Sequence, residues 1–292
     1  MNIFIQCVIN GVALGAVYTI MALSYTILFG TLKIANFAQG DIYMIGMLLG
    51  FTFYVTASMP FVVALILAVI ITAAVLLLIE RAIYRPILKV SSMYLFIATI
   101  GMATFLRNAA QLVFGSESYS FPHLFGSDPI QITESLSIIP QNIVIIVVCV
   151  ILVVALFLFM RKTKTGLAMS AVSMNPFAAS LMGVNYSQIT TITYTIAAAM
   201  AAIAGVFTGP LYNVSTTVGA TLGLKALIAA VMGGFGNSAG AIVGGMILGL
   251  VEALGSTYIS SAYKDAFAFI MLLIILFLRP QGILGRKSVS KV

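Results

Sequence analysis

The chain has 292 residues, of which 62% are hydrophobic and only 7% are charged, against roughly 25% charged residues in ordinary soluble domains. A water-soluble globule of this size keeps a polar exterior, so the composition excludes that class. The formal net charge of +7 comes from short clusters between apolar runs, which indicates orientation in a membrane and excludes nucleic acid as the expected partner.

A spanning helix needs about 20 mainly apolar residues, and the long runs here lack the short alternation of a β-barrel. The sequence predicts spans at residues 4–29, 42–58, 61–79, 93–113, 143–160, 189–208, 239–258 and 266–278. Segment 222–232 is apolar but short, so it either crosses the membrane or enters and returns. We predict an all-α polytopic membrane protein with eight or nine transmembrane helices in one domain, residues 1–292, with lipid around it.

The first run has no basic n-region and no small-residue cleavage site, so we interpret it as a retained span and not a signal peptide. Three basic clusters hold ten of the fourteen Lys and Arg residues: Arg81, Arg85 and Lys89; Arg161, Lys162 and Lys164; and Arg279, Arg286, Lys287 and Lys291. The loop at about 114–141 instead carries Glu117, Asp128 and Glu134. The positive-inside rule therefore predicts a cytoplasmic C-terminus, an external 114–141 loop and an external N-terminus, which favours nine spans.

Polar residues interrupt the pattern between the first two spans, where Asn36, Gln39 and Asp41 are crowded together. One interpretation is a polar loop between helices. The other is a broken helix end that lines a transport route, where irregular backbone faces water or protein. These three residues are therefore candidates for the substrate pathway.

Charges also occur within the spans, at Arg107, Lys225 and Glu252, where insertion costs about 2.5–3.5 kcal/mol for a charge at the bilayer centre. Arg107 lies near the outer end of its span, so we expect it to reach the interface and assign it no function. For Glu252 an interfacial position is favoured, with a pathway role as the alternative. Lys225 is a candidate for the pathway or for a subunit contact.

Small residues recur four apart in Gly11-x-x-x-Gly15, Gly46-x-x-x-Gly50 and the run from Gly236 through Gly240 and Gly244 to Gly245 and Gly249. Such faces let backbones approach closely in lipid. We expect them to pack helices of the same chain, with a partner subunit or a pathway wall as the alternatives.

Signals for an enzyme are sparse. His123 is the single histidine, and Cys7 and Cys149 lie in apolar runs without metal-ligand or redox spacing. The chain has no G-x-x-x-x-G-K-[ST] phosphate loop. We expect no catalysis, no metal and no cofactor on this chain, so any ATP would be bound by a partner subunit.

The cytoplasmic segment at about 161–187 is nearly free of acids. Asn175-Pro176 is typical of a helix N-cap followed by proline at the first helical position, and Gly183 fits a left-handed C-cap. The sequence predicts a helix of about two turns at 177–182 that either fits a partner's cleft or lies on the membrane surface.

Residues 177–183, Phe-Ala-Ala-Ser-Leu-Met-Gly, resemble the E-A-A-x-x-x-G core of the coupling loop in ABC-importer permeases, with Phe177 in place of the usual acid. The resemblance implies that Asn175, Pro176, Phe177, Ala178, Ala179 and Gly183 contact an ATPase subunit.

Further stretches resemble branched-chain amino acid permeases of the LivH type. These are residues 15–23, 34–41, 80–86, 229–236, 263–265 and 280–285, so the resemblance covers essentially the whole chain.

That resemblance implies an inner (plasma) membrane permease of an ATP-driven importer for leucine, isoleucine and valine. Its implied partners are a second related permease, two cytoplasmic ATPase subunits and an external substrate-binding protein. The alternatives are a related importer for urea or amides and an ion-coupled secondary transporter, which would need intramembrane acid–base or ion sites.

Overall fold

The computed structural model describes residues 2–88, 92–122, 126, 130–133 and 136–285. The chain forms α1 (Asn2–Leu32), α2 (Gln39–Phe51), η1 (Thr52–Thr56), α3 (Phe61–Ile79), η2 (Glu80–Tyr84), α4 (Arg85–Leu88), α5 (Ser92–Phe114), β1 (Ile130–Thr133), β2 (Leu136–Ile138), α6 (Pro140–Lys162), α7 (Lys164–Met174), α8 (Pro176–Leu181), α9 (Tyr186–Tyr212), α10 (Val218–Gly233), α11 (Ser238–Tyr258), η3 (Ser261–Tyr263) and α12 (Lys264–Leu278). Here η1 and η2 are π-helices and η3 is a 3-10 helix.

Long apolar runs become helices because an unpaired backbone group in lipid costs several kcal/mol, and a helix pairs these groups internally. Within the described residues, seven helical segments are long and apolar enough to cross a membrane: residues 3–32, 61–87, 93–114, 140–162, 186–212, 238–258 and 261–278. Two shorter helical segments, α10 and α2 with η1, overlap the other predicted runs. The all-α polytopic membrane fold is confirmed, and the count of eight or nine crossings stays a prediction.

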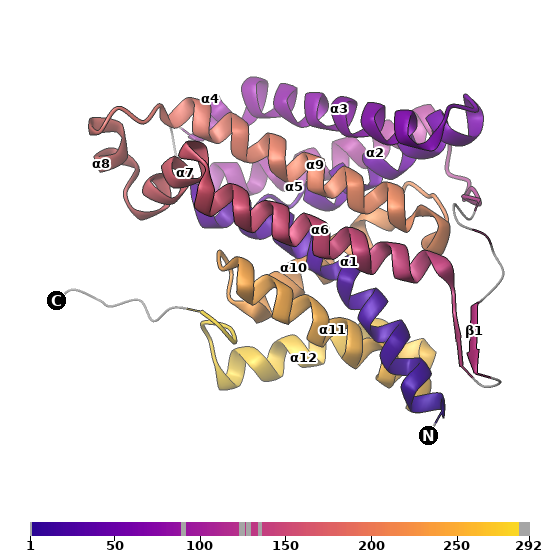
Figure 1. The fold of residues 1–292 in the computed structure, drawn as a ribbon. Helices are drawn as coiled ribbons and strands as arrows, with labels where there is room; N and C mark the ends of the chain where they lie inside the picture. The colour runs from indigo at the N-terminus through magenta and orange to yellow at the C-terminus, as the bar shows by residue number, and fades with distance from the viewer. Residues whose placement is uncertain (1, 89–91, 123–125, 127–129, 134–135, 286–292) are drawn as a thin grey trace.

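The helices differ sharply in how much of each is buried within the chain. In the most apolar window of each, 83% of α1 and 67% of α9 is buried, against 17% of α6 and 11% of the η3–α12 segment. In Figure 1, α1 runs diagonally through the molecule, with α3 and α9 on one side of it and α11 and α12 on the other. The core therefore lies around α1 and α9, and α6 and α12 present apolar outer surfaces.

The glycine faces pack helices of this chain against one another, as expected. A Cβ added to Gly249 would overlap the backbone nitrogen and Cα of Gly15, which places α11 directly on α1. Likewise, a Cβ on Gly46 would lie 2.5 Å from Cα of Ala202, so α2 lies close against α9. These contacts place backbone beside backbone, which no larger residue would allow.

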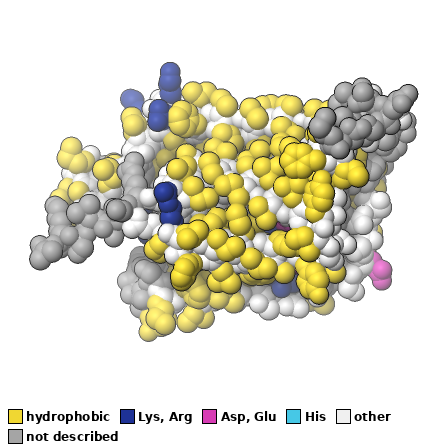
Figure 2. All heavy atoms as spheres, turned by 90° about the horizontal axis from the view of Figure 1, so that it is seen from below, with side chains coloured by type: hydrophobic (Ala, Val, Ile, Leu, Met, Phe, Trp, Pro, Cys, Tyr) yellow, Lys and Arg dark blue, Asp and Glu magenta, His cyan; other side chains and the backbone are white. Residues whose placement is uncertain are grey.

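Basic residues gather at one end of the bundle. Figure 1 shows α4, α7 and α8 at the end opposite the N-terminus and the β1–β2 hairpin. Arg81 lies in η2 and Arg85 begins α4, and Arg161, Lys162 and Lys164 lie where α6 meets α7. Figure 2 shows a broad hydrophobic face with Lys and Arg side chains prominent toward one end. These basic residues therefore lie at one end of the bundle, as the sequence predicts. Which side of the membrane this end faces stays a prediction.

Several residues used to predict orientation and chemistry lie outside the described residues: Lys89, His123, Asp128, Glu134, Arg286, Lys287 and Lys291. The loop predicted at 114–141 contains the antiparallel β1–β2 hairpin, in which Ile130 pairs with Ile138. That hairpin was not predicted. Gln6 near the start of α1 donates to the Ser137 carbonyl at 2.8 Å and so anchors the hairpin to the bundle.

We predict that Gly249→Leu destabilises the protein by about 1–3 kcal/mol or more, because the new side chain must separate α11 from α1. Thermal unfolding of the purified protein in detergent would measure the loss. Gly101→Leu is the matched control, since a Cβ at Gly101 meets nothing within 4 Å. Equal unfolding temperatures for the two variants would contradict the close α1–α11 contact.

Candidate functional site

The polar segment between α1 and α2 lies deep in the bundle. Asn36, Gln39 and Asp41 are each no more than 1% exposed. The Gln39 side-chain amide donates to the Ala197 carbonyl at 2.9 Å, and Ala197 is eleven residues after the first residue of α9, or about 16 Å along that helix. The segment is therefore a helix break inside the bundle, which favours the broken-helix interpretation over a surface loop.

Hydrogen bonds hold the break in an irregular shape. The Asn36 side-chain oxygen accepts from the Ala38 amide at 3.2 Å and from the Tyr84 hydroxyl at 3.3 Å. The Asn36 amide donates to the Gln39 side-chain oxygen at 3.3 Å. Lys33, the residue after α1, has φ of 58° and so turns the chain out of the helix. Asn36 thus supplies the polar partners that a continuous helix would have provided.

Glycine brings α10 against the same break. A Cβ on Gly40 would overlap the Gly219 carbonyl and lie 2.9 Å from Cα of Gly223. Both contacted glycines lie in the first half of α10. The start of α2 therefore meets α10 on one side and α9 on the other.

Asp41 forms an ion pair with Arg107 of α5. Arg107 Nε donates to Asp41 Oδ1 at 3.2 Å, and Nη2 donates to Oδ2 at 3.4 Å. The Asp41 side chain is 2% exposed and that of Arg107 is 34% exposed. The guanidinium turns toward a carboxylate whose charge has to be compensated, a pairing that the sequence did not indicate. The expectation that Arg107 reaches the interface stays a prediction.

A second charged cluster surrounds Glu252. Its carboxylate receives Lys225 Nζ at 2.8 Å, the Tyr18 hydroxyl at 2.7 Å and Lys264 Nζ at 3.3 Å. Lys225 also lies 2.7 Å from Asp265. Glu252 is fully buried within the chain, and its favoured interfacial position in the membrane stays a prediction. Paired acid and base let both charges sit inside the bundle, where an unpaired one would be costly.

The sequence candidates thus fall into two clusters. Asn36, Gln39 and Asp41 share the break between α1 and α2, whereas Lys225 and Glu252 join α10 to α11. Sequence reasoning assigned no role to Tyr18, Tyr84, Lys264 or Asp265, although all four stand in the noted stretches 15–23, 80–86 and 263–265. A buried hydroxyl has no sequence signature, because its partner comes from a distant helix.

The short helix predicted in the segment at about 161–187 is present as α8 (Pro176–Leu181). The Asn175 side chain accepts from the Ala178 amide at 3.1 Å, Pro176 is the first helical residue, and Gly183 has φ of +87°. The Val184 amide donates to the Ala179 carbonyl at 3.1 Å, which closes the C-terminal cap. Both predicted caps are confirmed.

Apolar side chains of α8 are exposed. Phe177 is 73% exposed and Met182 is 85% exposed, while Ala179 is buried. Figure 1 shows α8 projecting at the end of the bundle. Residues this apolar on a projecting helix are suited to contact another surface, protein or membrane.

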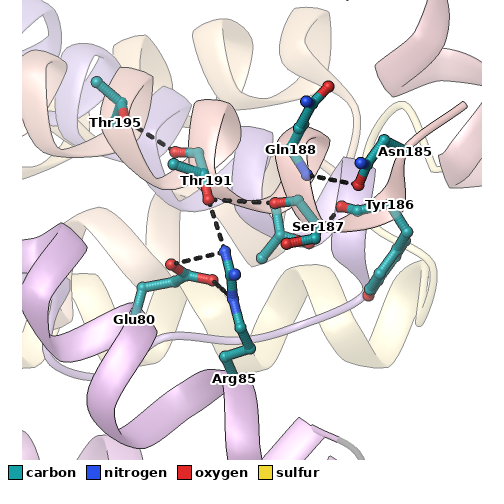
Figure 3. A network of polar contacts seen from close by, with 9 residues as sticks. Glu80, Arg85, Asn185, Tyr186, Ser187, Gln188, Thr191 and Thr195 are labelled. Carbon is teal, nitrogen blue, oxygen red and sulfur yellow. Dashed lines mark hydrogen bonds and ion pairs between the residues drawn. The ribbon is translucent and has the colours of Figure 1, made fainter.

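A third ion pair lies where η2 and the start of α4 meet α9 (Figure 3). Arg85 donates to Glu80 from Nε at 3.0 Å and to the Thr191 hydroxyl from Nη2 at 2.8 Å. Glu80 is fully buried. Asn185 caps α9 by accepting from the Gln188 amide at 3.2 Å. The Arg85 bridge therefore fixes the first turns of α9 to the end of the α3 segment.

The architecture, with a broken helix meeting two others deep in an apolar bundle, is that of a polytopic transport protein. Residues 7–276 match the family model described as the permease component of a branched-chain amino acid transport system. The chain belongs to this family, which confirms the resemblance noted from the sequence motifs.

Relatives match over nearly the full length. The chain is 38% identical to the high-affinity branched-chain amino acid transport system permease protein LivH of Salmonella typhimurium, over 99% of this chain and 98% of that protein. It is 35% identical to BraD of Pseudomonas aeruginosa over the same shares. A probable LivH of Methanocaldococcus jannaschii is 25% identical over 91% of this chain and 88% of that protein. Among solved structures, PsaBC from Streptococcus pneumoniae in complex with Fab is similar with a TM-score of 0.47 and 15% identity, over 96% and 91% of the two chains.

We predict that Asn36→Leu reduces transport by the assembled protein while subunit assembly is retained. Leucine cannot hold the Ala38 amide, the Tyr84 hydroxyl or the Gln39 side chain, so the break loses its shape. Uptake and co-purification of subunits would be measured side by side. Ser24→Ala is the control, because among the described residues Ser24 bonds only the Met21 carbonyl of its own helix. Normal uptake by the Asn36 variant would show that the segment is an ordinary loop between helices.

Proposed function

We propose that this chain is a transmembrane subunit of an ATP-driven importer for the branched-chain amino acids leucine, isoleucine and valine, in the inner membrane. The observation that carries the proposal is the 38% identity to a branched-chain amino acid permease over 99% of the chain. A second related permease completes the translocation route, two cytoplasmic ATPase subunits supply the energy, and an external binding protein delivers substrate.

The paired charges support an ATP-driven machine over an ion-coupled carrier. An ion-coupled carrier needs an acid that exchanges protons or ions during transport. In the part of the chain that the structure describes, each buried acid lies in an ion pair, Asp41 with Arg107, Glu80 with Arg85 and Glu252 with Lys225. We propose that the α8 end is cytoplasmic, following the basic clusters.

We further propose that α8 transmits movement from the ATPase to the helix break. Phe177 and Met182 would fill a cleft of the partner, and burying each side chain is worth about 1.5–3 kcal/mol. The α9 helix begins five residues after α8 ends, and Ala197 of α9 holds Gln39. A tilt of α9 would therefore move the break directly.

We predict that the chain alone in liposomes takes up no leucine, isoleucine or valine. Uptake should appear when the second permease, the ATPases and the binding protein are present with ATP inside. Radiolabelled uptake measures both states, with urea as a parallel substrate. Ion-gradient-driven uptake by the lone chain would contradict the proposal. Uptake of urea without uptake of leucine would show that urea, and not a branched-chain amino acid, is the substrate.

We predict that Gly183→Val weakens ATPase binding or uncouples hydrolysis from transport. The residue has φ of +87°, and a β-branched side chain there costs about 1 kcal/mol or more. Gly183→Asn is the matched control, because asparagine tolerates the left-handed region. ATPase activity and uptake would be compared in proteoliposomes.

In a parallel measurement, cysteines at Phe177 or Ala178 should crosslink to the ATPase subunit. Crosslinks to the external binding protein instead would invert the proposed orientation.

A further inference from the structure

The second half of α5 carries an outward-facing polar patch in an otherwise apolar surface. The α5 polar patch consists of Gly101, Thr104, Arg107, Asn108 and Gln111, spaced three or four residues apart so that they share one side of the helix. Gly101, Thr104 and Asn108 are exposed, and Arg107 and Gln111 are partly exposed. The patch extends over about 15 Å of helix.

Arg107 makes this patch poorly suited to contact lipid. Arg107 lies seven residues before the end of α5, about 10 Å inside the helix end, where a cationic side chain is costly next to hydrocarbon. The outer face of α12 shows the contrast, since it exposes Phe269, Ile270, Leu273, Ile274, Phe277 and Leu278. On α5 itself, Phe105 and Leu112 are 63% and 89% exposed beside the patch. Arg107 is therefore the residue of this side that calls for water or protein as its neighbour, and α12 has a face suited to lipid.

The ion pair with Asp41 uses only some of the N–H donors of Arg107. A guanidinium has five N–H donors, and two of them reach Asp41. The other three have no partner in the described part of the chain. The two bonds, at 3.2 and 3.4 Å, are longer than the 2.7–2.9 Å usual for charge-assisted bonds. Asp41 lies behind this guanidinium, with 2% of its side chain exposed.

We propose that Arg107 and Asp41 form a headgroup site for a zwitterionic α-amino acid in the translocation route. Arg107 binds the carboxylate of the substrate through its planar N–H fork, and Asp41 receives the ammonium once the guanidinium moves aside. The inference rests on the proposed function and deepens it.

An exchange of partners explains why a charged pair suits this site. Without substrate, each protein charge compensates the other inside the bundle. When an amino acid enters, its carboxylate and ammonium take over the two contacts, so no charge is left unpaired at any stage. Thr104 and Asn108 on the same side of α5 supply short polar groups beside the site.

The test uses the complete transporter in proteoliposomes with saturating leucine-loaded binding protein and ATP inside. The variants are Arg107→Gln, Asp41→Asn, Arg107→Lys and the charge exchange Asp41→Arg with Arg107→Asp. We expect a loss of about tenfold or more in leucine uptake for both neutral variants, with subunit co-purification and stimulated ATPase activity retained. Arg107→Lys should keep part of the uptake, because it keeps the cation and loses the fork. Phe277→Leu on α12 is the control and should transport normally.

Three results would overturn the headgroup site. Wild-type uptake by Arg107→Gln would show that the cation is dispensable. Restored uptake in the charge exchange would show that the pair only holds helices together, because a headgroup site depends on which charge lies on which helix. If the second permease no longer co-purified with the Arg107→Gln variant, the patch would be a contact between subunits and not a substrate site. A wild-type complex that carries urea or an amide but no leucine would contradict the proposed function itself, whatever the variants do.

Discussion

A charge held within the hydrocarbon layer needs an opposite charge beside it, since insertion alone costs about 2.5–3.5 kcal/mol and removal of one partner from a buried pair costs about 3–5 kcal/mol. This constraint connects the helices of the described chain. Asp41 joins α2 to α5, Glu80 with Arg85 joins the α3 segment to α9, and Glu252 joins α11 to α10 and α12. The Asp41–Arg107 pair links positions 66 residues apart, and Arg85 reaches Thr191, 106 residues further along the chain.

Close glycine packing determines where these charges meet. Gly249 on Gly15 and Gly40 on Gly219 set backbones almost in contact, which draws α1, α2, α10 and α11 together around short polar groups. Asn36 and Gln39 then satisfy the interrupted backbone at the depth of Ala197. The same packing that stabilises the bundle thus places an irregular polar segment in its interior, which is the position that the proposed transport route requires.

The sequence predicts local features well because their causes are local. The apolar runs, the Asn175 cap and the positive φ of Gly183 all follow from residues within a few positions of one another. Pairings across helices have no such signature. The pairing of Arg107 with Asp41 and of Glu252 with Lys225 was not predicted, because the partners come from helices whose placement sequence alone does not define. The ambiguity at Asn36 had the same origin, since a polar loop and a broken helix differ only in depth.

The most direct test of the account asks whether the polar side of α5 borders water in the working complex. Single cysteines at Thr104 and Asn108 would be placed in a chain with Cys7 and Cys149 replaced, and their labelling by a charged, water-soluble thiol reagent would be timed in the assembled transporter. The account predicts rapid labelling that leucine transport slows, and negligible labelling of a cysteine at Phe277, which is 90% exposed on the apolar face of α12. Labelling at Thr104 and Asn108 as slow as at Phe277 would contradict it.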